Sequence, residues 1–138
     1  MPTRIFPGRH DSLEQLGEYV SNQATAAGLN ENEVYAVQLA VDEAASNIID
    51  HAYGGENRGD IECTCKIDEN RIEVILRDTG KSFVPEEVPE LQSGVPLSEF
   101  GPRGAGLTLM NKLMDEVRFE FLDGANVLTM VKRRKKIP

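Results

Sequence analysis

Three polar residues stand at regular intervals in the segment VDEAASNIIDHAY. Glu43, Asn47 and His51 follow one another at four-residue steps, and residues at this spacing lie along one face of an α-helix. Burying an acid, an amide and an imidazole without partners would be costly. The line therefore indicates either a site that uses these groups or a helix face that simply contacts water.

A carboxylate stands where a strand-like pattern ends. In IEVILRDTGKSF the alternation of apolar and polar residues stops at Asp78, and Thr79 and Gly80 follow. A carboxylate in this place could accept a hydrogen bond from a ligand amine, while the bare backbone of Gly80 approaches the ligand ring. Asp-Thr-Gly is also a common turn sequence, so the motif alone leaves both interpretations open.

Three glycines surround an arginine directly before an apolar, helix-like run. Gly101, Gly104 and Gly106 flank Arg103 in EFGPRGAGLTLMNKLMDEV. Glycine weakens the start of a helix, so something at this point favours the absence of side chains. The two physical explanations are a backbone that approaches a ligand closely and a helix that packs tightly on a sheet.

The two cysteines form a C-x-C pair within an alternating segment. Cys63 and Cys65 share their spacing of two with Ile61 and Ile67 in IECTCKI, which places both thiols on one face of a strand. The sequence contains no second cluster of Cys or His. We therefore favour core packing over metal binding for these thiols.

Local signals predict two helices that would position the polar residues. Asp11 or Ser12 can cap the first helix, with an acid or amide three residues on. Asn30 can cap the second helix, with Glu33 at its third position. The predicted stops are Gly28 for the first helix and Gly54-Gly55 for the second.

The remaining pattern predicts strands, and the order of elements predicts the fold. Alternation is typical of strands in four segments, which pair as two hairpins around short polar turns; they are 60–67, 71–78, 117–121 and 126–132, with a short further strand at 4–7. We predict a single α+β domain over residues 1–138: a two-layer α/β sandwich with a mixed, mostly antiparallel sheet and helices on one face. The Pro-rich segment at about 81–103 is interpreted as a lid or a disordered insert.

Composition and charge narrow the class of protein. Charged residues are 28% of the chain and the formal net charge is −8. Without the five positive charges of KRRKK (132–136), in the predicted basic tail 132–138, the net charge falls to −13. This negative charge on the rest of the chain disfavours direct binding of nucleic acid and is compatible with a basic partner protein. No apolar run is long enough to cross a membrane and no secretory signal begins the chain, so we expect a cytoplasmic protein.

Taken in order, these motifs resemble the GHKL ATP-binding fold. The order is Glu-x-x-x-Asn on a helix, Asp-x-Gly after a strand, a Pro-rich segment, and Gly-x-x-Gly-x-Gly opening a helix. The nearest resemblance is to the bacterial anti-sigma factor serine kinases of the RsbW and SpoIIAB type, over roughly residues 10–133. AVDEAASNIIDHAY is similar to their N-box, and GPRGAGLTLMNKLMDEV to their second glycine box. One departure is Ser82, which stands where the first glycine box usually has its second glycine.

The resemblance implies a site for ATP with Mg²⁺. Asn47 would offer a neutral oxygen to the metal, and Glu43 would act as the catalytic base or orient the attacking hydroxyl. Asp78 would accept the exocyclic amine of adenine, and the glycine-rich segment with Arg103 would hold the phosphates. The implied nucleotide-binding residues are Asn47, Asp78, Gly80, Arg103, Gly104, Ala105, Gly106, Leu107 and Thr129.

The same resemblance implies a regulatory function. The protein would phosphorylate a serine of an anti-sigma factor antagonist, a small STAS-domain protein, and would sequester a sigma factor. Members of the family often form homodimers, so the resemblance also implies a homodimer. The alternative is a non-catalytic switch that binds ATP or ADP and exchanges partners without phosphoryl transfer. A plain α+β interaction domain without nucleotide is the third interpretation.

Overall fold

The computed structural model describes residues 3–82 and 109–135. The elements follow one another as β1 (Thr3–Pro7), α1 (Ser12–Ala26), α2 (Glu31–Asn47), the π-helix η1 (Ile48–Ala52), β2 (Asp60–Asp68), β3 (Arg71–Asp78), β4 (Glu116–Leu122) and β5 (Ala125–Arg133). Residues 109–113 are also helical. None of the helices in the described ranges is long and apolar enough to cross a membrane.

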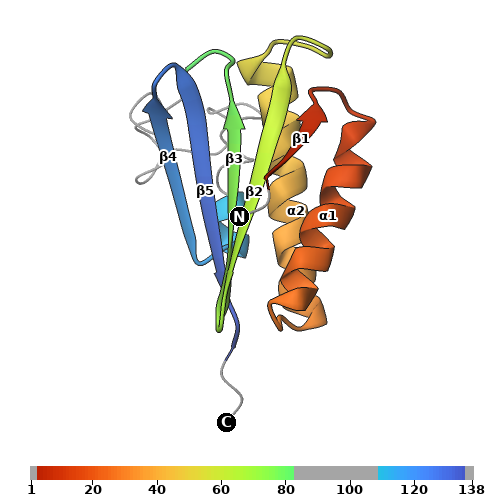
Figure 1. Ribbon diagram of the computed structural model, residues 1–138, viewed down its shortest axis with the longest axis vertical. Helices are drawn as coiled ribbons and strands as arrows, with labels where there is room; N and C mark the ends of the chain where they lie inside the picture. Colours follow the sequence, from red (N-terminus) through yellow and green to blue (C-terminus); the bar gives the residue numbers. More distant parts are fainter. Residues whose placement is uncertain (1–2, 83–108, 136–138) are drawn as a thin grey trace.

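The strands form a sheet in the order β1-β2-β3-β5-β4, and every pair within the described residues is antiparallel. Helices α1 and α2 pack against each other on one side of this sheet (Figure 1). The two-layer α+β prediction is therefore confirmed, with an antiparallel sheet in place of a mixed one. Alternate strand residues face the helices and are buried; they include Phe6, Ile61, Cys63, Cys65, Ile72, Val74, Leu76, Leu128 and Met130.

The start of α2 is fixed as its sequence predicts. The side chain of Asn30 accepts a hydrogen bond from the backbone N–H of Glu33, and the Glu33 carboxylate accepts one from the backbone N–H of Asn30, both at 2.8 Å. This capping box satisfies two backbone donors that a helix start leaves open. The prediction for α1 is only partly right: the helix begins at Ser12, but Asp11 makes no capping hydrogen bond.

The hairpin between β4 and β5 turns at two residues with positive φ. Asp123 has φ 53° and Gly124 has φ 77°, the signature of a type I′ turn, whose twist matches that of the strands. At the other end of β5, the strand continues to Arg133, and the Nζ of Lys132 donates to the carbonyl of Leu113 at 2.7 Å. Lys132 and Arg133, the first two residues of the predicted basic tail 132–138, therefore belong to the sheet.

Both cysteines lie in the core, as the alternation predicts. Cys63 and Cys65 are buried free thiols on the face of β2 that packs against the helices. The contact with Cys65, together with burial, raises the pKa of the Cys63 thiol well above its ordinary value. Cys63 therefore stays protonated at neutral pH and acts as a small apolar group.

Candidate functional site

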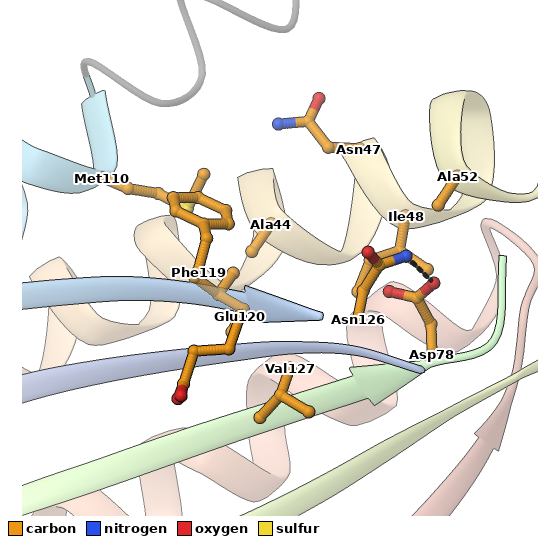
Figure 2. A pocket seen from close by; sticks show the side chains of 11 residues that line it. Ala44, Asn47, Ile48, Ala52, Asp78, Met110, Phe119, Glu120, Asn126 and Val127 are labelled. Carbon is orange, nitrogen blue, oxygen red and sulfur yellow. Dashed lines mark hydrogen bonds between the residues drawn. The ribbon is translucent and has the colours of Figure 1, made fainter. Parts of the chain in front are cut away.

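A cavity lies between the end of α2 and the adjoining ends of strands β3, β4 and β5 (Figure 2). The enclosed space is about 40 Å³ and opens to solvent; it is smaller than the roughly 300–1,000 Å³ of typical small-molecule sites, so a nucleotide would fill it and extend beyond its mouth. The walls are mainly apolar, with a few polar groups. The lining residues are Ala44, Asn47, Ile48, Ala52, Asp78, Met110, Phe119, Glu120, Asn126, Val127 and Leu128.

The structure brings Asn47 and Asp78 to this one cavity from distant parts of the chain. Asn47 is the last residue of α2, and Asp78 is the last residue of β3. The Nδ2 atom of Asn47 is buried and has no hydrogen-bond partner among the described residues. Since buried amides normally have partners, this side chain is suited to a ligand that would complete its contacts.

A hydrogen-bond network holds Asp78. Its side chain is only 3% exposed, and Oδ1 accepts from the backbone N–H of Gly80 and from Nδ2 of Asn126, both at 2.9 Å. The Nδ2 group of Asn126 also donates to the carbonyl of Lys81 at 2.9 Å. Figure 2 shows the two side chains facing each other at the cavity floor. Asn126 thus joins the carboxylate and the following loop to β5.

Gly80 packs against the end of the π-helix, which explains why no side chain is present there. A Cβ on this residue would lie 2.6 Å from the carbonyl carbon and oxygen of Ala52. The next residue, Lys81, donates its backbone N–H to the same carbonyl at 2.7 Å. The loop after β3 is therefore fixed against η1 on one side and against Asn126 on the other.

Tyr53 also contacts the loop after β3, through its hydroxyl group. Its hydroxyl donates to the carbonyl of Asp60 at 2.6 Å and accepts from the backbone N–H of Thr79 at 3.1 Å. Its ring covers Gly59, where a Cβ would come within 2.3 Å of a ring carbon. The position of Asp78 is thus supported through its chain neighbours as well as through its own side chain.

The π-helix changes the predicted arrangement of α2. The sequence predicts one α-helix up to the glycine pair, whereas the chain changes at Ile48 to a π-helix, with a bond from the N–H of Tyr53 to the carbonyl of Ile48. This wider turn breaks the four-residue register between Asn47 and His51. Glu43 keeps its place one turn before Asn47; it is half-buried and does not line the cavity.

Other predicted residues lie away from the cavity or outside the described ranges. Thr129 is buried, but it alternates with Leu128 and Met130, which face the helices, and it does not line the cavity. The glycine-rich segment falls outside the described residues, and so does most of the expected lid. The residues concerned are Arg103, Gly104, Ala105, Gly106 and Leu107.

A charged cluster ties the end of β1 to the π-helix. The Nε2 atom of His10 lies 3.0 Å from Oδ1 of Asp50 in η1, and its Nδ1 atom lies 3.4 Å from Oε1 of Glu56. The hydrogen bond with Glu56, reinforced by Asp50, raises the pKa of His10 above its ordinary 6.5, although desolvation opposes the shift. Both ring nitrogens face carboxylates, which favours the imidazolium form.

Within residues 3–82 and 109–135 there is a second hollow but no metal-binding cluster. A hollow of about 260 Å³ lies between β1 and α1, away from every predicted site residue. No group of three His, Cys, Asp or Glu side chains in these ranges is placed to hold a metal ion. The hollow's lining residues are Arg4, Gln15, Glu18, Tyr19 and Asn22.

Sequence reasoning missed Asn126 and Tyr53. The predicted hairpins give no signal for Asn126, because Asp78 stands opposite Asn126 only through the pairing of β3 with β5, which joins one hairpin to the other. That pairing is not local, since the two residues are 48 positions apart. Tyr53 gives no signal either, because its contacts depend on the course of the loop between η1 and β2.

Comparison with known proteins gives a consistent set of similarities. Residues 6–132 match the family described as histidine kinase-like ATPase domain. The chain is 33% identical over 112 residues to the serine-protein kinase RsbW of Bacillus velezensis, covering 78% of this chain and 70% of the relative. It is 32% identical over 130 residues to RsbW of Halalkalibacterium halodurans, covering 91% and 78%.

Solved structures share the fold at low sequence identity. The structure of the RsbU and RsbW domains of Rv1364c from Mycobacterium tuberculosis matches all of this chain with a TM-score of 0.63 and 12% identity, and the match spans 35% of that larger chain. The catalytic domain of histidine kinase ThkA, in a nucleotide-free form, matches 99% of this chain and 100% of its own length, with a TM-score of 0.59 and 14% identity.

Proposed function

We propose a function for this chain from its family, since it belongs to the histidine kinase-like ATPase family and to its RsbW-type serine-protein kinases. The chain binds ATP in the cavity beside Asn47 and transfers the γ-phosphoryl group to a protein serine. The observation that supports this most directly is the meeting of Asn47 and Asp78 at one cavity. These two residues come from the two motifs that resemble the nucleotide-binding boxes of the family.

The proposed adenine contact uses the carboxylate at the cavity floor. Oδ1 of Asp78 accepts two N–H donors, which hold the carboxyl group in one orientation. An exocyclic amine entering the cavity would donate to it, and the apolar wall formed by Ala44, Ile48 and Met110 would cover the ring. Gly80 keeps its backbone close to η1, so the loop leaves room for the base.

Asn47 fits the role of a magnesium ligand. Its amide borders the cavity, and Oδ1 is the atom that could bind the ion. The buried Nδ2 atom, which has no partner among the described residues, could donate to a phosphate oxygen beside it. Mg²⁺ takes one or two protein oxygens and keeps its other ligands as water and phosphate oxygens. When bound, the ion would neutralise charge on the phosphates during transfer.

We assign the role of base to Glu43. It lies one helical turn before Asn47 on α2 and is half-buried, and the four-residue spacing puts it on the same helix face as Asn47. The serine hydroxyl would form a bond to the γ-phosphorus while the bond from that phosphorus to the β,γ-bridging oxygen breaks. Glu43 would take the hydroxyl proton, which leaves ADP and phosphoserine.

The proposed partners follow from the family. The substrate would be an anti-sigma factor antagonist of the STAS type, and the chain would sequester a sigma factor in the cytoplasm, acting as a homodimer. The acidic body of the chain, with a formal net charge of −8 overall, suits a basic partner surface better than nucleic acid.

Phosphoryl transfer from labelled ATP to the cognate antagonist tests this function. Glu43→Gln should lower the transfer rate by about 10²–10⁴-fold, the usual contribution of a general base, and leave ATP affinity within about threefold. Asp42→Asn, an exposed neighbour on α2, is the matched control and should transfer at the wild-type rate. Transfer by Glu43→Gln at that rate would contradict the assignment. ATP binding without transfer by the wild type would favour the non-catalytic partner switch.

A further inference from the structure

Asn126 is the polar neighbour of the proposed adenine contact that the motifs do not include. It lies near the start of β5, is 8% exposed and stands opposite Asp78 in the pairing of β3 with β5. An asparagine in a buried strand position is costly unless its amide is satisfied. Here its amide group donates to the carboxylate oxygen of Asp78 and to the carbonyl of Lys81, each at 2.9 Å.

These bonds restrict the orientation of the Asp78 carboxylate. Oδ1 of Asp78 receives both the Asn126 and the Gly80 donors, so the carboxylate cannot rotate without losing two hydrogen bonds. The contact of Asn126 with the carbonyl of Lys81 holds the loop that carries Gly80. One side chain therefore sets the orientation of the carboxylate and the position of the backbone beside it.

We propose that Asn126 is a positioning residue that makes the cavity selective for 6-aminopurine nucleotides. This inference rests on the proposed function, because it concerns the base that Asp78 reads. A carboxylate held in one orientation presents an acceptor at a fixed point, and a 6-amino group can donate to it. A purine with hydrogen at position 6 leaves the carboxylate without that donor, which a buried acceptor penalises.

The size of the selectivity follows from the strength of such a bond. A hydrogen bond to a charged group corresponds to an affinity difference of roughly 10- to 100-fold. Without Asn126, the carboxylate keeps only the Gly80 donor among the two described here and gains rotational freedom. The preference for the amino group should then fall, because the acceptor is no longer preorganised.

The test compares two nucleotides on the full chain by isothermal titration with Mg²⁺. The probes are ATP and purine riboside 5′-triphosphate, which lacks only the 6-amino group. The wild type should bind ATP about 10- to 100-fold more tightly. Asn126→Ala and Asn126→Leu, which keeps the branched shape of the side chain, should both reduce this ratio to about threefold or less. Thermal unfolding is recorded for each, so that either variant decides the question if the other fails to fold.

A control separates selectivity from stability. Thr64→Ala removes the 2.7 Å hydrogen bond between the hydroxyls of Thr3 and Thr64, which joins β2 to the edge strand β1. It should lower the unfolding temperature and leave the nucleotide ratio at the wild-type value. If the Asn126 variants lose stability but keep the wild-type ratio, the role is structural only and the inference fails, while the kinase proposal stands. A wild type that binds both probes equally also overturns the inference alone. A wild type that binds neither overturns the proposed function and the inference with it.

Discussion

Replacing Asp78 by asparagine should abolish tight ATP binding and leave the fold intact. In the wild type, Oδ1 accepts from Gly80 and from Asn126 at 2.9 Å each. An amide at this position keeps both bonds only if its oxygen takes the place of Oδ1, and its NH2 group then points where the second carboxylate oxygen was. A 6-amino group entering the cavity would meet another donor.

The magnitude follows from two contributions. Loss of a hydrogen bond to a charged group costs about 1.5–3 kcal/mol, and a donor left unsatisfied in a buried place adds about 1–3 kcal/mol. Taking about 3–4 kcal/mol together, the affinity for ATP should fall by about 10²–10³-fold. Stability should change by less than about 1 kcal/mol, because both internal hydrogen bonds are retained and one buried charge is removed.

Titration of Mg-ATP into Asp78→Asn, with thermal unfolding in parallel, separates these effects. Asp42→Asn makes the same chemical change on the exposed side of α2 and should bind ATP as the wild type does. A folded Asp78→Asn protein that binds ATP within threefold of the wild type would refute the role of Asp78 in reading the base.

Two further variants probe the supports of the site. Gly80→Ala should lower the unfolding temperature and weaken ATP binding at least about tenfold, because its Cβ would lie 2.6 Å from the Ala52 backbone. The control is Gly17→Ala in α1, whose Cβ would have its nearest contact at 3.6 Å; it should be neutral or stabilising by up to about 1 kcal/mol. Equal effects of the two substitutions would contradict this packing argument. His10→Gln should be less stable than the wild type below pH 6.5, with the difference disappearing as pH rises through the raised pKa of His10. Urea unfolding across pH 5–9 measures it, and a difference independent of pH would show that the imidazolium pair with Glu56 contributes nothing.

The parts of the fold that the sequence predicts well depend on neighbours in the chain. The capping box of Asn30 and Glu33 needs only residues three apart, and the turn at Asp123-Gly124 needs only two residues that tolerate positive φ. The burial of Cys63 follows from the period of two along β2. These features are local, so single-sequence patterns are sufficient to find them.

The parts that the sequence does not predict depend on contacts between distant segments. The π-helix after Asn47 has the composition of an ordinary helix, and its wider turn is accompanied by the bond between Lys81 and Ala52. The sequence makes Thr129 a candidate for a nucleotide contact, because it is polar and on the last strand. In the structure the neighbouring Leu128 faces the helices, so Thr129 lies on the opposite face of the sheet. One position along a strand decides which face a side chain occupies.

The same register argument explains why the site and the sheet form together. Asp78 ends β3 and Asn126 begins the paired part of β5, so their hydrogen bond closes the central strand pair at its cavity end. On the opposite wall, η1 is held through the carbonyl of Ala52 by the loop that Asn126 also holds. A ligand that contacts Asp78 therefore acts on the junction of α2, β3 and β5 at once. Its binding energy is added to tertiary contacts that already join distant segments of the chain, rather than to a single loop.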